Sequence, residues 1–192
     1  MTGSGKTTFA LAYLQNVAAA CRFVFDDLGQ CSARLKLPAA GTASELESAL
    51  ATRWVVFNPH RMFPGNIEGA FRFFCQWAYD ASRRGPGKKV LLVDELWKFC
   101  SPNQIPKELA IVAQTGRVED LELLTATQLP HKIHASITGQ STELVCFRLD
   151  EALALDKVEE LGADRAAVQS LPLGSFVALN RLSRGRIVGK IF

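Results

Sequence analysis

The sequence predicts an α/β fold, with a mostly parallel β-sheet flanked by helices and a β-hairpin at one edge. Short apolar runs rich in β-branched and aromatic residues alternate with segments whose apolar residues recur at helical spacing. This alternation is typical of parallel sheets with helical crossovers. The C-terminal part differs, because two strand-like runs, 175–182 and 186–192, are joined by the turn Ser183-Arg184-Gly185. We expect this hairpin to extend one edge of the sheet.

The individual elements follow from the same spacing rules. Apolar residues recur every three or four positions between 67 and 78, which predicts an amphipathic helix over 67–82. Residues 28–43 are rich in Gly, Pro and Ala and are predicted to be a loop, and Ser44 is predicted to cap the next helix with Glu47. The predicted strands are 22–26, 54–57, 90–93, 121–127 and 144–147. The other predicted helices are 9–14, one that includes 109–112, and the stretches 151–161 and 164–170.

The composition is typical of a globular protein. A chain of 192 residues, 48% hydrophobic and 21% charged, fits one globular domain with a sizeable core. The net charge of +3 is too small to predict nucleic-acid binding by itself. The five cysteines are scattered and contain no C-x-x-C motif, which predicts reduced, mostly buried thiols and a cytoplasmic location. No apolar run reaches the roughly 20 residues that a membrane-spanning helix needs.

The N-terminus carries a phosphate-binding motif. Gly5-Lys6-Thr7 supplies the end of the P-loop pattern G-x-x-x-x-G-K-[ST], in which backbone N–H groups surround phosphate oxygens and the Lys reaches the β- and γ-phosphates. The helix that follows presents its N-terminus to the anion. We therefore expect ATP as the ligand, with Lys6 also acting in catalysis. The predicted nucleotide-binding residues are Gly3, Ser4, Gly5, Lys6, Thr7 and Thr8.

The position of this motif is unusual. A P-loop normally follows a buried strand, and its leading Gly would precede Met1. A missing central strand would leave two unpaired sheet edges, and unsatisfied buried backbone groups cost about 1–3 kcal/mol each. We therefore expect residues 1–192 to be a single ATPase domain that is truncated just before its P-loop.

A second motif predicts catalysis. The apolar run 90–93 ends in Asp94-Glu95, a Walker B arrangement in which a buried strand holds carboxylates opposite the P-loop. Asp94 is expected to bind Mg²⁺ together with the Thr7 hydroxyl. Glu95 is expected to be the general base that activates water. An exposed acidic turn is the alternative, and the aromatic residues Trp97 and Phe99 are predicted to pack in the core.

Two polar residues lie near the strand 121–127. Gln128 follows its end, where an amide can contact the γ-phosphate; the alternative is a Gln that caps a strand. Arg117, after Gly116, precedes the strand and could reach into a neighbouring subunit as an arginine finger, which is worth about 10³–10⁵ in rate. A solvated Arg117 is the alternative, and Arg148 is another candidate for the finger.

Together these motifs resemble the FtsK/HerA superfamily of RecA-like (ASCE) P-loop ATPases. The resembling segments are Thr2-Gly3-Ser4-Gly5-Lys6-Thr7, Leu92-Val93-Asp94-Glu95, Gly116-Arg117, Leu123-Leu124-Thr125-Ala126-Thr127-Gln128-Leu129-Pro130 and Val145-Cys146-Phe147-Arg148-Leu149. The resemblance implies a hexameric ring, ATP and Mg²⁺ as cofactors, Gln128 as a sensor and Arg117 as a residue that serves the next subunit.

Within that superfamily the compact length is similar to the genome-packaging ATPases of tectivirus-like phages. This implies translocation of double-stranded DNA without sequence specificity, and a capsid vertex or a membrane complex as a further partner. A zonula-occludens-toxin-type assembly ATPase of filamentous phages is the first alternative, although that type usually carries a membrane segment. An inactive, truncated remnant is the second. The location is host cytoplasm, or the virion for a phage protein.

Two basic clusters could neutralise DNA phosphates. One comprises Arg83, Arg84, Lys88 and Lys89, and the other comprises Arg181, Arg184, Arg186 and Lys190. Solvated turns and charged edge strands are the alternative for both.

Overall fold

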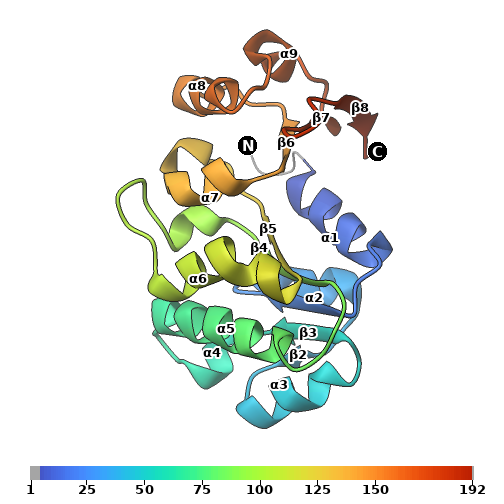
Figure 1. The fold of residues 1–192 in the computed structure, drawn as a ribbon, viewed down its shortest axis with the longest axis vertical. Coiled ribbons are helices and arrows are strands. Elements are labelled where there is room, and N and C mark those ends of the chain that lie inside the picture. The colour runs from blue at the N-terminus through green and yellow to red at the C-terminus, as the bar shows by residue number, and fades with distance from the viewer. Residues whose placement is uncertain (1–4, 192) are drawn as a thin grey trace.

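The computed structural model describes residues 5–191 and contains two sheets (Figure 1). The first is parallel and five-stranded, in the order β2-β3-β1-β4-β5. The second is antiparallel and three-stranded, in the order β6-β7-β8. The strands are β1 (Cys21–Phe25), β2 (Ala39–Ala40), β3 (Trp54–Phe57), β4 (Lys89–Val93), β5 (Leu121–Thr125), β6 (Glu143–Phe147), β7 (Ser175–Asn180) and β8 (Arg186–Lys190).

Helices connect the strands, and the sequence predicted most of them. The α-helices are α1 (Lys6–Asn16), α2 (Gln30–Leu35), α3 (Ala43–Leu50), α4 (Pro59–Met62), α5 (Ile67–Ser82), α6 (Lys107–Thr115), α7 (Ala135–Gln140), α8 (Ala152–Glu160) and α9 (Arg165–Gln169). The short helices α2, α4 and α7 were not predicted. Three short 3₁₀ segments are η1 (Leu96–Lys98), η2 (Gly116–Glu119) and η3 (Pro130–Lys132). In the described part of the chain, no helix has the length and apolar content needed to cross a membrane.

The parallel sheet is covered on both faces. In β4, Leu91 and Val93 point into a core formed with α3, α5 and α6, while Val90 and Leu92 point into a second core formed with α1 and α2. All five residues of β4 are consequently buried. Because side chains alternate along a strand, a continuous apolar run is what a strand covered on both faces requires.

The antiparallel sheet has its own core at one end of the molecule (Figure 1). Cys146 packs with Leu155 and Val158 of α8 and with Val168 of α9. The C-terminal hairpin is confirmed, but it pairs with β6 and does not extend the parallel sheet. Within residues 5–191, no strand pairs with the outer edge of β5 or with the outer edge of β6. The predicted extension therefore fails because β6 and β5 do not meet in a shared ladder.

The segment predicted as a loop, 28–43, contains structure that its composition obscured. It holds α2 and the two-residue strand β2, which pairs with β3. The cap of α3 is Thr42, whose hydroxyl accepts from the Glu45 amide at 3.2 Å, while the Glu45 carboxylate accepts from Gly41 N at 2.6 Å. The predicted cap at Ser44 is therefore wrong by two residues, since the same Ser/Thr-x-x-Glu pattern fits both positions.

Candidate active site

The P-loop motif forms the first turn of α1. Gly5 has a φ of 100°, a left-handed conformation that glycine adopts without a steric penalty, and α1 begins at the next residue. The Gly5 carbonyl accepts from Phe9 N at 2.8 Å, which closes the first helical turn. Lys6, Thr7 and Thr8 follow in that turn, where the backbone N–H groups of a helix start and the helix dipole favour anions. The predicted ligands Gly3 and Ser4 lie outside the described residues.

Thr7 at the start of α1 and Asp94 just after β4 are in direct contact. The Thr7 hydroxyl donates to Asp94 Oδ2 at 2.6 Å, and this contact joins residues 87 positions apart. The other oxygen, Asp94 Oδ1, accepts from Glu95 N at 3.0 Å. A hydroxyl and a carboxylate side by side at the phosphate loop are the oxygen donors that Mg²⁺ prefers. The two residues therefore fit the predicted metal site.

Lys6 lies among these acidic groups. Burial lowers the pKa of the Lys6 ammonium from its usual value, while the negative charges of Glu95 and Asp94 oppose that shift. The carboxylates thus favour the charged form that a phosphate would need.

Glu95 is restrained by several donors. Its backbone is left-handed, with a φ of 50°, and it begins the 3₁₀ segment η1. Its carboxylate accepts from Trp97 Nε1 at 2.7 Å, from Gln128 Nε2 at 2.8 Å and from Gln128 N at 3.3 Å. Such conformations cost roughly 1–3 kcal/mol and are common at functional sites.

Strand pairing brings Gln128 to Glu95. β5 lies beside β4, and the ladder continues past both strands: Ala126 N donates to Val93 O, and Leu96 N donates to Ala126 O, both at 3.1 Å. The carboxyl ends of neighbouring parallel strands meet at one sheet edge, so the side chains that follow them converge. Lys6, Thr7, Asp94, Glu95 and Gln128 are thereby brought together at this edge.

Sequence reasoning missed two contacts of this site. Trp97 was expected only to pack, yet its indole N–H donates to Glu95, and Lys132 Nζ lies 5.2 Å from its ring centroid. Arg34 of α2 donates to the Thr8 hydroxyl at 3.3 Å. In the sequence, only the two-residue spacing between Glu95 and Trp97 could have indicated the contact between these two side chains. Phe99, by contrast, packs as predicted, stacked on Phe71 with ring centroids 4.1 Å apart.

Arg117 lies away from this cluster. It is exposed on η2, which precedes β5, so it lies at the amino end of the strand whose carboxyl end leads to Gln128. Gly116 is buried there, and an added Cβ would come within 2.8 Å of the Leu121 carbonyl. The other candidate, Arg148, donates to Asp150 at 3.1 Å. Next to Arg117, the side chain of Val118 is 82% exposed.

The two basic clusters differ in their partners. In the first, Arg83, Arg84 and Lys88 form ion pairs with Glu119, Glu47 and Glu122, and Lys89 Nζ donates to a backbone carbonyl. In the second, only Arg181 is engaged, donating to the carbonyls of Thr138 and Ser141. Arg184, Arg186 and Lys190 are exposed and form no ion pair within residues 5–191.

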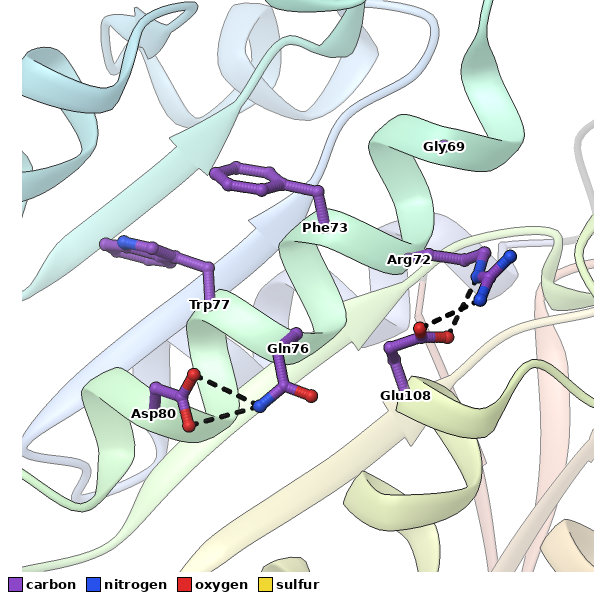
Figure 2. Close-up of a pocket in the computed structure, with 7 residues that line it drawn as sticks. All are labelled: Gly69, Arg72, Phe73, Gln76, Trp77, Asp80 and Glu108. Atoms are coloured by element: carbon purple, nitrogen blue, oxygen red, sulfur yellow. Dashed lines mark hydrogen bonds and ion pairs between the residues drawn. The ribbon is translucent and has the colours of Figure 1, made fainter.

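A hollow on α5 and α6 is separate from this site. Figure 2 shows its polar side chains in two pairs: Arg72 makes two contacts of 3.0 Å with Glu108, and Gln76 makes two of 3.1 Å with Asp80. Because α5 and α1 pack on opposite faces of the sheet, none of the predicted site residues lines this hollow.

The fold is that of the P-loop NTPases, with the first turn of α1 beside the residues that follow β4. Solved structures share it. The genome-packaging NTPase B204 of Sulfolobus turreted icosahedral virus 2, in complex with AMPPCP, has a TM-score of 0.78 at 18% identity, over 99% of this chain and 93% of that chain. The same protein with ATP-gammaS has a TM-score of 0.72 at 16% identity, over 100% and 94% of the two chains.

A more distant structure shares part of the fold. The bacterial conjugative coupling protein TrwB has a TM-score of 0.52 at 12% identity, over 72% of this chain and 40% of that chain. No protein-family model and no curated protein matches this sequence. The expected resemblance to FtsK/HerA-type packaging ATPases is thus confirmed at the level of the fold.

Proposed function

We propose that this protein is an ATP-hydrolysing motor that forms a ring, a hexamer by the family resemblance, and translocates double-stranded DNA to package a viral genome. The observation that carries the proposal is the contact between Thr7 of the phosphate loop and Asp94 at the end of β4. The fold shared with B204, a genome-packaging NTPase crystallised with nucleotides, supports the packaging setting.

In this proposal the first turn of α1 and the Lys6 ammonium bind the phosphates of ATP. Thr7 and Asp94 hold Mg²⁺, which supplies charge neutralisation on the phosphates when it is bound. Thr8 lies beside Arg34, which adds positive charge near the same turn. Backbone donors at a helix N-terminus and one lysine are the usual means of binding a polyphosphate.

Glu95 is the proposed general base. Its carboxylate has about four lone-pair sites, and hydrogen bonds from the described residues 5–191 occupy three of them. The fourth site can accept a proton from water. The water oxygen then attacks the γ-phosphorus and the bond to ADP breaks. Gln128 Nε2 carries two N–H groups, and the one not used by Glu95 can donate to a γ-phosphate oxygen. This arrangement supports Gln128 as the sensor.

Arg117 is the proposed finger for a neighbouring subunit. It lies at the opposite end of β5 from Gln128, so it cannot serve the site of its own subunit. A finger in trans stabilises the charge of the transition state on the adjacent nucleotide. The ion pair between Arg148 and Asp150 makes Arg148 the weaker candidate.

The hairpin β7–β8 is the proposed DNA contact. Arg184, Arg186 and Lys190 have no acidic partner in the described chain, whereas Arg83, Arg84 and Lys88 are paired with glutamates. Non-specific binding to duplex DNA depends on cations that are available for phosphates. We expect the motor to act in the host cytoplasm, or at a capsid vertex.

The test is ATP turnover by the purified protein at low salt, with and without double-stranded DNA. Turnover that rises with DNA is the expected result. Turnover indifferent to DNA would contradict the translocase and favour an assembly ATPase that works on a membrane complex. Loss of nucleotide binding, measured with a fluorescent ATP analogue on folded protein, would favour an inactive remnant.

A further inference from the structure

Trp97 contacts the carboxylate that the proposed mechanism uses as a base. Its indole Nε1 donates to Glu95 Oε2 at 2.7 Å, the shortest of the three hydrogen bonds that Glu95 accepts. Hydrogen bonds to a charged acceptor are about twice as strong as neutral ones. The indole is rigid and half-buried, so its N–H holds a long and otherwise flexible side chain.

The direction of these bonds distinguishes the two oxygens of Glu95. Oε2 accepts from Trp97 Nε1 and from Gln128 N, which fills its two lone-pair directions. Within residues 5–191, Oε1 accepts only from Gln128 Nε2. Oε1 is therefore the oxygen with capacity left to receive a proton, and Trp97 helps to decide which oxygen that is.

A second residue restrains Trp97. Lys132 Nζ lies 5.2 Å from the centroid of the Trp97 ring, within the range of cation–π contacts. Lys132 ends η3, the segment that follows Gln128 along the chain. The same stretch, 128–132, thus contacts Glu95 through Gln128 and contacts Trp97 through Lys132.

We propose that Trp97 is a positioning residue for Glu95, held in turn by Lys132, and that it directs Glu95 Oε1 to the attacking water. This inference rests on the proposed ATP hydrolysis. It assigns a polar role to an aromatic residue whose expected role was packing alone. The 128–132 stretch would then couple the sensor amide and the orientation of the base.

The test is Trp97→Phe, which keeps an aromatic ring beside Lys132 and removes the N–H. The matched control is Trp77→Phe, because Trp77 Nε1 also donates to a glutamate, Glu47, at 3.0 Å on the opposite face of the sheet from α1. We expect kcat of Trp97→Phe to fall roughly tenfold to a hundredfold with KM unchanged, the loss typical of one hydrogen bond to a charged group. Trp77→Phe should keep the kcat of the unmodified protein.

A double variant separates positioning from general damage to the fold. In a Glu95→Gln background, Trp97→Phe should lower the residual kcat no further, because the base that Trp97 orients is already gone. An equal fall of kcat in both backgrounds, or a Trp97→Phe kcat equal to that of Trp77→Phe, would overturn the inference.

A further measurement needs neither ATP nor the Trp97→Phe variant. It therefore still tests the inference if that variant does not fold or if the protein does not hydrolyse ATP. The chain has three tryptophans, so their indole N–H resonances can be separated by NMR. Glu95→Gln should move the resonance of Trp97 and leave those of Trp54 and Trp77 in place. An unmoved Trp97 resonance would overturn the inference. Absence of ATP turnover in the unmodified protein would instead count against the proposed function.

Discussion

Gln128 and Glu95 share a hydrogen bond at the ends of two adjacent strands. Gln128 Nε2 donates to Glu95 Oε1 at 2.8 Å, and Gln128 N donates to Oε2 at 3.3 Å. The contact depends on β5 lying next to β4 in parallel, with Leu124 opposite Leu92 and Thr125 opposite Val93. In the proposed mechanism, where Gln128 is the sensor and Glu95 the base, this contact would let both respond together to the γ-phosphate.

Removing the amide should slow hydrolysis more than it weakens binding. We expect Gln128→Ala to lower kcat about tenfold to a hundredfold, since Glu95 loses a charged hydrogen bond. Nucleotide affinity should change little. The matched control is Gln76→Ala, because Gln76 also donates to a carboxylate, that of Asp80, on α5. Steady-state kinetics give kcat for both variants. An equal kcat in the two would refute the role of Gln128.

The Thr7–Asp94 contact predicts that changing Thr7 will weaken the Mg²⁺-dependent binding of ATP. Thr7→Ala removes the hydroxyl that lies 2.6 Å from Asp94 Oδ2, so we expect Mg²⁺-dependent affinity for ATP to fall at least about tenfold. Thr7→Ser keeps the hydroxyl and should retain most of the affinity. Titration with a fluorescent ATP analogue, with Mg²⁺ and with EDTA, measures both variants. Equal Mg²⁺ dependence in Thr7→Ala and Thr7→Ser would contradict the site.

The position of Arg117 predicts complementation between subunits. Arg117→Ala and Glu95→Gln should each lack turnover, with a loss of about 10³–10⁵ for the finger. Mixed rings should recover part of the activity, because a Glu95→Gln subunit can supply Arg117 to a neighbour that retains Glu95. Turnover of the mixture is the measurement, and Arg148→Ala is the matched control. A mixture as inactive as its components would exclude action in trans.

Three cations of the hairpin that form no ion pair within residues 5–191 predict where DNA binds. Replacing Arg184, Arg186 and Lys190 with Gln should weaken DNA binding and reduce the slope of log K against log salt by about 0.9 for each phosphate that is no longer neutralised. Replacing Arg83, Arg84 and Lys88 should leave the slope nearly unchanged, because those side chains already pair with glutamates. Fluorescence anisotropy with a labelled duplex at several salt concentrations compares the two variants. The opposite ranking would move the DNA-binding surface to the first cluster.

The buried cysteines predict slow thiol chemistry. Burial raises the pKa of Cys21 to about 11 and those of Cys31 and Cys146 to about 12. A thiol pKa above the solution pH leaves the neutral form dominant, so only about one in 10⁴ of the Cys146 thiols is ionised near pH 8. Labelling with a chromogenic disulfide should be slow in the native protein and reach all five cysteines in denaturant. Fast native labelling of these three would be the contrary result.

Much of the fold could be predicted because local patterns determine it. The helix 67–82 and the strand 54–57 match α5 and β3, since apolar spacing reports burial directly. The prediction of a loop over residues 28–43 was wrong, because α2 and β2 are short and acquire stability from tertiary contacts. One such contact is the buried Asp26 carboxylate, which accepts from Cys31 N and Ser32 N. The hairpin and the strand 144–147 were both predicted, but the pairing between them was not.

The sequence by itself determined the pattern from which the chemistry of the site is proposed: a phosphate-loop motif at Gly5-Lys6-Thr7, two carboxylates after a buried run, and a polar residue after the next strand. Residue types and spacing suffice there, because backbone geometry at strand ends and helix starts is stereotyped. Only the tertiary structure decided the partners: Gln128 on Glu95, Lys132 on Trp97, glutamates on the first basic cluster, and β6 beside the hairpin. Such contacts depend on side chains distant in sequence, which no local pattern encodes.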